Sequence, residues 1–213
     1  MSPPAAAMSA RRSGARRRGG ARRRRTRAVW VAGLALAAVG IVLAMPLFKK
    51  AVNELSLPLA YSDVIRQQAA EKHLDPALIA AVIYAETKFD ARTSAAGAQG
   101  LMQILPGTAE YLARRSGATT FTARDLDTPA VNIAYGSYYL RYLLDHYGGS
   151  VTLALAAYNG GMTNVDSWLA RARSEGTGLT VSDIPFPETR AYVQRVLQAQ
   201  QDYRRTYPQE LYG

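Results

Sequence analysis

The sequence predicts an all-α fold preceded by one transmembrane helix. No stretch alternates apolar and polar residues over the length of a strand, and no internal repeat occurs. Helix-start and helix-stop residues recur through residues 61–213. Residues 28–48 carry no charge, and a helix of this length spans about 30 Å, the thickness of a bilayer core. We therefore divide the chain into a tail (1–27), a transmembrane anchor (28–48), a linker (49–60) and a helical domain (61–213).

Proline and glycine mark the ends of the expected helices. Asp75 followed by Pro76 is typical of an N-cap and first turn, and Gly148 with Gly149 is typical of a helix end. Ser62 and Asp63 are expected to cap the first helix of the domain. The expected helices cover about residues 62–73, 76–87, 106–117, 129–147, 151–158, 163–172 and 188–205.

The positive charge is concentrated at the N-terminus. The chain has 213 residues, with 26 Lys and Arg against 16 Asp and Glu, and a net charge of +10. Ten arginines and no acid fall within residues 1–27, so the rest of the chain carries 16 bases and 16 acids. A basic protein often binds nucleic acid, but here only the tail is basic. We expect a disordered tail near anionic lipid and no nucleic-acid partner.

The charges flanking residues 28–48 indicate their orientation. Ten arginines precede this stretch and Lys49 and Lys50 follow it, so the positive-inside rule places the N-terminus in the cytoplasm. The expected protein crosses the plasma (inner) membrane once and has its domain on the periplasmic or extracytoplasmic side. A cleaved signal peptide is the alternative, with small residues at Ala35 and Ala37, although a signal core is usually about 7–15 residues. Both interpretations export the domain.

The amino-acid composition excludes several kinds of functional site. The chain contains no cysteine and two histidines. Disulfides, thiolate metal sites and a cysteine nucleophile are therefore excluded, and a histidine-rich metal centre is poorly supplied. We expect neither a metal nor a cofactor.

One carboxylate lies on an apolar helix face. Glu86 follows Val82 and Ile83 at spacings of four and three residues, so it shares their stripe of the expected helix 76–87. A carboxylate held there loses hydration, which raises its pKa. A carboxyl that is still protonated near neutral pH suits a general acid for glycoside cleavage. The alternative is a glutamate in the last helical turn that bends to water.

Four sequence motifs then occur in order. They are YAETKFD at residues 84–90, SAAGAQGLMQILPGTA at 94–109, AAYNGG at 156–161 and ETRAYV at 188–193. Together they resemble the catalytic core of lytic transglycosylases of the soluble (SLT, goose-lysozyme-like) family, over about residues 61–207. The resemblance implies a lysozyme-like helical domain that acts on the glycan strands of peptidoglycan.

The resemblance also implies roles for particular residues. Glu86 matches the single catalytic acid, which protonates the oxygen between N-acetylmuramic acid and N-acetylglucosamine and then deprotonates the C6 hydroxyl, giving a 1,6-anhydro product. Tyr192 matches a tyrosine whose hydroxyl orients that carboxyl. The implied substrate-binding residues are Ser94, Met102, Gln103, Tyr158, Asn159 and Tyr192. The segment between Glu86 and the Gly-Leu-Met-Gln motif is one residue shorter than is usual, which affects Ser94 most.

Two other functions remain as alternatives. A hydrolytic muramidase needs a second carboxylate to activate water, for which Asp90, Asp125 and Asp127 are the candidates. A non-catalytic peptidoglycan-binding module would need no acid, and the presence of Glu86 argues against it. The sequence identifies no protein partner.

Four tyrosines cluster in the expected long helix, namely Tyr135, Tyr138, Tyr139 and Tyr142. Some tyrosines of this kind stack on sugar rings, but their helical spacing favours packing in the core.

Overall fold

The computed structural model describes residues 39–42, 45 and 57–213. The predicted tail, nearly all of the predicted anchor (28–48) and most of the predicted linker (49–60) lie outside these residues. Within the described part of the chain, no helix has the length and apolar character needed to cross a membrane. The chain divides into two units, Met1–Val52 and Asn53–Gly213, and the second unit contains the predicted domain.

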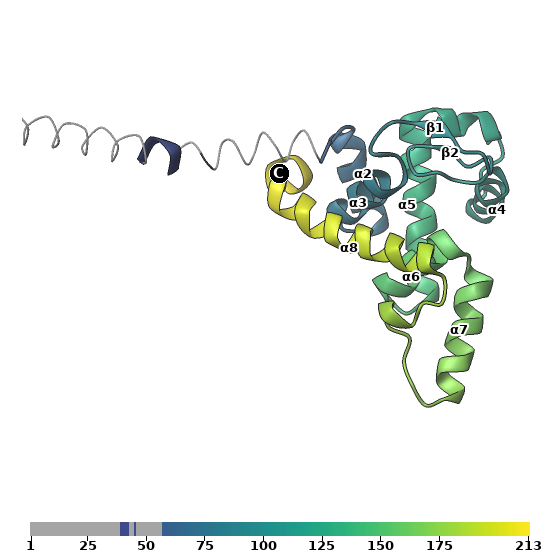
Figure 1. The fold of residues 1–213 in the computed structure, drawn as a ribbon. Coiled ribbons are helices and arrows are strands. Elements are labelled where there is room, and N and C mark those ends of the chain that lie inside the picture. The colour runs from purple at the N-terminus through teal and green to yellow at the C-terminus, as the bar shows by residue number, and fades with distance from the viewer. Residues whose placement is uncertain (1–38, 43–44, 46–56) are drawn as a thin grey trace, which may run out of the picture. The chain divides into compact units, whose positions relative to one another are not determined.

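The predicted helical fold is confirmed, with one small sheet that the sequence pattern did not reveal (Figure 1). The sheet pairs β1 (Arg92–Thr93) with β2 (Gln99–Gly100) in antiparallel register. The α-helices of the second unit are α2 (Ser62–Lys72), α3 (Pro76–Thr87), α4 (Pro106–Ser116), α5 (Pro129–His146), α6 (Val151–Gly160), α7 (Met162–Ser174), α8 (Pro187–Thr206) and α9 (Pro208–Tyr212), with 3₁₀ turns at Ala123–Asp127 and Val181–Asp183.

Helix starts follow the local sequence with one exception. Asp75 caps α3, where its carboxylate accepts a hydrogen bond from the Ala77 amide at 3.1 Å. Ser150 caps α6 in the same way through the Leu153 amide. The predicted cap at Ser62 and Asp63 is wrong, because Tyr61 occupies the N-cap in the left-handed region at φ 57° and makes no side-chain cap bond. A tyrosine there carries no sequence signal for a helix start.

Helix α3 is the centre of the core. Every residue from Ala77 to Ile83 is buried, so this helix is apolar around its whole circumference. It packs along α8, while α5 packs against α2 and α6. The C-terminal end of α3 carries Glu86, and the fixed position of this helix therefore fixes the position of that residue.

The segment before the predicted domain boundary is packed into the domain. Leu57 is buried, and its carbonyl accepts a hydrogen bond from the Tyr207 hydroxyl at 2.8 Å. The carbonyl of Pro58 accepts one from the Tyr203 hydroxyl at 2.5 Å. The last residues of the predicted linker are thus part of the folded unit.

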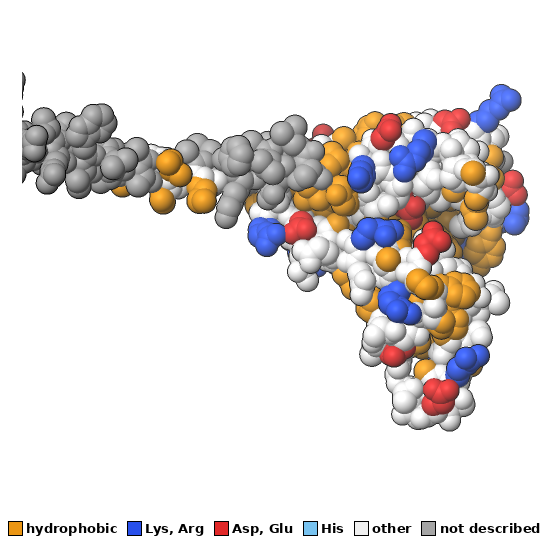
Figure 2. Space-filling model, in the orientation of Figure 1, with side chains coloured by type: hydrophobic (Ala, Val, Ile, Leu, Met, Phe, Trp, Pro, Cys, Tyr) orange, Lys and Arg blue, Asp and Glu red, His pale blue; other side chains and the backbone are white. Residues whose placement is uncertain are grey.

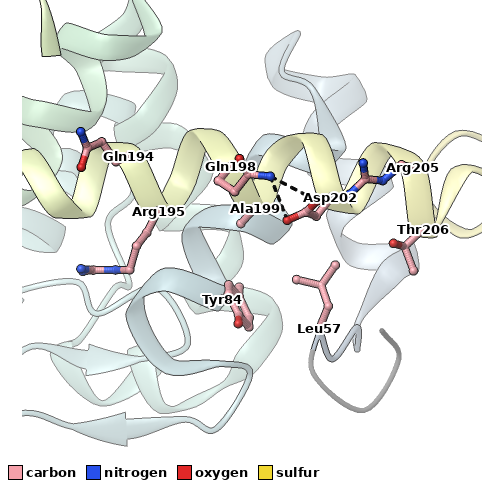
Figure 3. A pocket seen from close by; sticks show the side chains of 9 residues that line it. All are labelled: Leu57, Tyr84, Gln194, Arg195, Gln198, Ala199, Asp202, Arg205 and Thr206. Atoms are coloured by element: carbon pink, nitrogen blue, oxygen red, sulfur yellow. Dashed lines mark hydrogen bonds and ion pairs between the residues drawn. The ribbon is translucent and has the colours of Figure 1, made fainter. Parts of the chain in front are cut away.

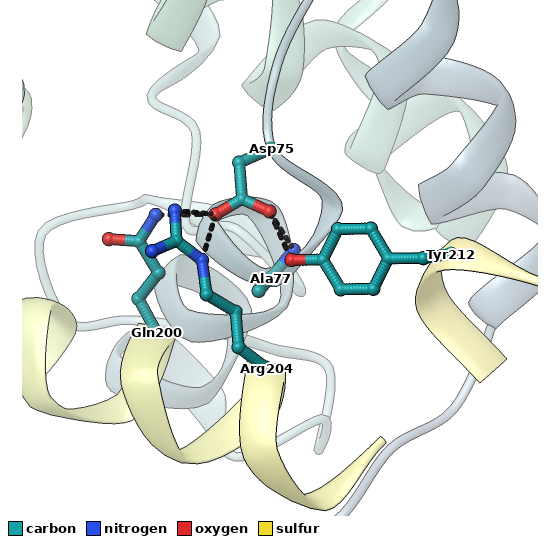
Figure 4. A network of polar contacts seen from close by, with 5 residues as sticks. All are labelled: Asp75, Ala77, Gln200, Arg204 and Tyr212. Carbon is teal, nitrogen blue, oxygen red and sulfur yellow. Dashed lines mark hydrogen bonds and ion pairs between the residues drawn. The ribbon is translucent and has the colours of Figure 1, made fainter. Parts of the chain in front are cut away.

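A polar network joins the N-terminal end of α3 to the end of the chain (Figure 4). One oxygen of Asp75 accepts hydrogen bonds from Gln200 at 2.5 Å and from Arg204 at 2.7 Å. The other oxygen accepts one from the Tyr212 hydroxyl at 2.5 Å. Burial alone would raise the pKa of Asp75, but these hydrogen bonds outweigh it and hold the pKa below its ordinary value.

We expect Asp75→Ala to lower the free energy of unfolding by about 2–4 kcal/mol, because it removes both a helix cap and the partner of three side chains. The folded-state pKa of Asp75 lies below the unfolded value, so this contribution is present at neutral pH and is lost as the pH falls through the folded-state pKa. Urea unfolding at pH 7 and in acid measures both effects. The matched control is Asp63→Ala, which breaks an ion pair whose carboxylate side chain is 87% exposed and should change stability little. Equal losses for the two variants would contradict the prediction.

Candidate active site

Glu86 lies one residue before the end of α3, and its carboxyl group is largely removed from water. This burial raises its pKa to about 7. Three groups oppose the rise, namely the Tyr192 hydroxyl and the guanidinium groups of Arg195 and Arg92. The carboxyl is therefore protonated in a substantial fraction of molecules at neutral pH and can donate a proton there.

Tyr192 reaches Glu86 from α8. Its side chain is only 2% exposed, and its hydroxyl has no hydrogen-bond partner of normal geometry among the described residues. The hydroxyl nevertheless lies near enough to the Glu86 carboxylate to lower the pKa of that group. A buried hydroxyl without another partner is free to bond the carboxylate, and such catalytic bonds are often long when no substrate is bound.

Replacing Tyr192 by phenylalanine should raise the pKa of Glu86 above about 7, because the hydroxyl that favours the ionised form is removed while burial is kept. Carbon-detected NMR titration of the Glu86 carboxyl measures this directly. Tyr203→Phe is the matched control, since Tyr203 is also a buried tyrosine of α8 but donates to Pro58 instead. An unchanged Glu86 pKa in Tyr192→Phe would refute the contact.

The loop from Gln99 to Ile104 lies beside the end of α3 that carries Glu86. It begins on β2 and closes on itself, because the amide of Gln99 donates to the Ile104 carbonyl at 2.9 Å and the Ile104 amide donates back at 3.0 Å. Gln103 has left-handed backbone geometry at φ 49°. Its side-chain amide donates to the carbonyls of Arg92 at 2.7 Å and Gly100 at 2.9 Å. Gln103 therefore ties this loop to the β hairpin.

The sequence reasoning missed Asn132, which holds this loop against α5. Asn132 is fully buried, and its oxygen accepts from the Met102 amide at 2.8 Å. Its nitrogen donates to the carbonyls of Gln99 at 2.9 Å and Leu126 at 3.1 Å. No local pattern marks an asparagine as the partner of a loop 30 residues away.

Two glycines permit this close approach. A Cβ on Gly100 would lie 2.1 Å from the Asn132 nitrogen, and its φ of +74° is one that L side chains rarely adopt. On α5, a Cβ on Gly136 would lie 2.3 Å from the Met102 sulfur. Met102 is 0% exposed and its side chain packs against Gly136 of α5, and its role in a sugar subsite stays a prediction from the resemblance.

Of the remaining predicted binding residues, Tyr158 lies near Glu86, Asn159 lies on α6 and Ser94 lies in the β hairpin. The Tyr158 hydroxyl donates to the Met102 carbonyl at 2.8 Å, and burial together with the nearby Glu86 raises the pKa of Tyr158 far above its ordinary value. Asn159 follows it on α6 and is exposed. Ser94 lies in the turn of the β hairpin, where its hydroxyl oxygen accepts from the Ala98 amide at 3.0 Å. The substrate-binding roles of Ser94, Asn159 and Gln103 stay predictions.

Thr87 stabilises the end of α3 beside the acid. Its buried hydroxyl donates to the Leu101 carbonyl at 2.7 Å and lies 3.2 Å from the Ile83 carbonyl. The Arg92 guanidinium donates to the Glu86 carbonyl at 3.1 Å and so caps the same end.

Among the described residues, no three His, Asp or Glu side chains are grouped as metal ligands.

A groove of about 670 Å³ runs along α8 (Figure 3). Gln194 and Arg195 project at one end, and Leu57 and Thr206 lie at the other. Gln198 and Arg205 bond Asp202 within it. Arg195 is the residue that lines this groove and also acts electrostatically on Glu86.

Residues 63–180 match the family model described as the transglycosylase SLT domain, which covers more than half of the chain. The chain belongs to the SLT domain family. It is 33% identical over 154 residues to the soluble lytic murein transglycosylase of Escherichia coli, and this match covers 71% of the chain and 24% of that relative. It is 41% identical over 121 residues to a transglycosylase of Enterobacteria phage PRD1, covering 56% of the chain and 42% of the phage protein.

Solved structures show the same fold. The 70 kDa soluble lytic transglycosylase of Escherichia coli superimposes with a TM-score of 0.67 at 32% identity, covering 71% of the chain and 25% of that structure. A lytic transglycosylase Slt of Pseudomonas aeruginosa gives 0.66 at 31% identity, covering 73% and 26%. The chain thus contains a lysozyme-like SLT domain and spans about a quarter of the length of these soluble relatives.

Proposed function

We propose that this SLT domain is a peptidoglycan lytic transglycosylase. It cleaves the β-1,4 bond between N-acetylmuramic acid and N-acetylglucosamine and leaves a 1,6-anhydromuramoyl end. The observation that carries this proposal is Glu86, a carboxyl whose burial raises its pKa to about 7 beside the buried hydroxyl of Tyr192. Family membership and the names of the relatives support the choice of substrate.

One carboxyl performs both proton transfers. Glu86 in its acid form protonates the glycosidic oxygen, and the bond between that oxygen and C1 of the muramic acid breaks. The C6 oxygen of the same muramic acid then attacks C1, and the Glu86 carboxylate removes the proton from this C6 hydroxyl. Tyr192 stabilises the carboxylate form between the two steps, because a hydrogen bond to the charged form favours it. Glu86 ends the cycle protonated, as it began.

The positions of the other acids support the lytic reaction over hydrolysis. Hydrolysis by two carboxylates requires a second one close to the first. Within the described residues, the charged groups that shift the Glu86 pKa are Arg195 and Arg92, and no carboxylate is among them. Asp90 and Asp127 are exposed, and Asp125 bonds the amide and hydroxyl of Thr122 in a capping box. None of the three candidate carboxylates is among the groups that shift the pKa of Glu86, which supports the lytic reaction.

We also propose that residues 28–48 anchor the enzyme in the plasma membrane, with the N-terminus in the cytoplasm and the SLT domain outside. The uncharged stretch and the ten arginines before it support this topology. Carbonate extraction of membranes tests it, together with protease treatment of spheroplasts. An anchored protein stays in the pellet and loses its domain to external protease. A soluble domain released by signal cleavage would refute the anchor.

The decisive experiment on the activity is digestion of purified sacculi with the full chain, followed by mass spectrometry of the muropeptides. We expect products with anhydromuramoyl ends. Products heavier by one water would assign a muramidase instead. Binding to sacculi without any release of fragments would assign a non-catalytic module.

A further inference from the structure

One face of α5 carries a row of aromatic side chains. Tyr135, Tyr139, Tyr142 and His146 recur every three or four residues and so lie along one stripe, which we call the aromatic stripe. The expectation that the tyrosines of this helix pack in the core is met in part, because Tyr135, Tyr139 and Tyr142 are half-buried against the core, whereas His146 is exposed. The buried face of α5 is formed by other residues, including Asn132, Gly136 and Leu140.

The middle of the aromatic stripe is in contact with the catalytic centre. The ring of Tyr139 lies 5.2 Å from that of Tyr158, measured between centroids. Tyr158 is in turn close enough to Glu86 for that carboxylate to raise its pKa. The next ring, Tyr142, stacks on Tyr139 at 6.5 Å with an interplanar angle of 16°. A continuous series of rings therefore leads from Glu86 toward the C-terminal end of α5.

The far end of the series is an open, amphipathic hollow. It measures about 340 Å³ and is lined by Arg115, Tyr138, Arg141, Tyr142, Asp145 and His146. Tyr111 of α4 is 41% exposed and contacts Tyr142 edge-on at 6.0 Å, with the two hydroxyls 3.3 Å apart. The Arg115 guanidinium lies 5.0 Å above the Tyr142 ring. Figure 2 shows hydrophobic side chains, tyrosine included, gathered between the regions of α4 and α7.

We propose that Tyr111, Tyr142 and the hollow beside them form a distal subsite that binds glycan several sugars away from the bond cleaved at Glu86. This inference rests on the proposed function, because the occupant is the continuation of the same peptidoglycan strand. A pyranose ring has apolar C–H faces and hydroxyls at its edge, which match aromatic rings flanked by Arg and Asp side chains. The ring contacts from Tyr142 through Tyr139 to Tyr158 connect this subsite to the residues around Glu86.

The test measures binding, so that it does not depend on turnover. All variants are made in the full chain carrying Glu86→Gln, and affinity is measured for long peptide-free glycan strands and for a disaccharide. We expect Tyr111→Ala with Tyr142→Ala to weaken binding of long strands about five- to tenfold and that of the disaccharide less than about twofold. The double Phe variant keeps both rings and should retain the affinity for long strands. Tyr61→Asn is the matched control, an exposed tyrosine in left-handed geometry that asparagine tolerates.

The outcomes separate this inference from the proposed function. Unchanged affinity of the Ala variant for long strands overturns the distal subsite, as does an equal loss for both ligands or a loss that the Phe variant shares. Failure of the chain without Glu86→Gln to release anhydromuropeptides overturns the proposed function alone, because length-dependent binding is measured without cleavage.

Discussion

Glu86→Gln is expected to abolish turnover and at the same time to stabilise the fold. Glutamine keeps the size of the side chain but cannot donate the proton that cleavage needs, so release of muropeptides should fall by about a thousandfold or more. The folded-state pKa of about 7 lies above 4.5, the ordinary value for a glutamate. As the pH rises from 4.5 to about 7, the Glu86 carboxyl ionises in the unfolded chain but stays protonated in the folded one. The free energy of unfolding therefore falls over this pH range.

The size of this effect follows from the difference between the two pKa values. At pH 8 the glutamine variant should be more stable than the parent chain by up to about 3 kcal/mol, and at pH 4 the two should be equally stable. Thermal unfolding across this range measures the difference. The control is Glu110→Gln on α4, an exposed glutamate whose replacement should leave activity and stability at pH 8 unchanged. A glutamine variant that is less stable at pH 8 would contradict the burial that underlies the proposed mechanism.

Asn132→Leu is expected to be among the most destabilising single changes in the domain. Leucine has a similar volume but leaves the Met102 amide and the Leu126 carbonyl without this partner, while the Gln99 carbonyl keeps its bond from the Ile104 amide. Each unsatisfied group costs about 1–3 kcal/mol, so the expected loss is about 3–5 kcal/mol. Chemical denaturation with the linear extrapolation measures it.

A second asparagine provides the comparison. Asn164 is half-buried on α7 and donates a single hydrogen bond to the Gly160 carbonyl at 2.7 Å. Asn164→Leu should therefore cost about 1 kcal/mol. If the two substitutions destabilised the domain equally, the three bonds of Asn132 would not be what holds the loop.

The sequence predicted the parts of the fold that have local causes. Asp75 and the prolines at helix starts define most helix beginnings, because capping and the fixed φ of proline act within one turn. The position of Glu86 on an apolar face also follows from helical periodicity within a single segment. The raised pKa of Glu86 was expected from the same reasoning and agrees with the structure.

Features that depend on distant contacts could not be predicted in this way. Strands of two residues each are too short to show alternation, so β1 and β2 left no pattern. Asn132 acts only through a loop that is remote in sequence. The extent to which the tyrosines of α5 are buried could not be predicted, because periodicity places them on one face but does not say how far a neighbouring helix covers that face.

The antiparallel packing of α3 and α8 has a practical consequence for handling the protein. The same two helices meet at Asp75 with Arg204 and, one helix length away, at Glu86 with Tyr192. Tyr212, one residue before Gly213, is bonded to the first of these junctions. A bulky label attached at Tyr212 would therefore strain the base of the helix that presents Glu86, so labels and surface linkages are better placed elsewhere.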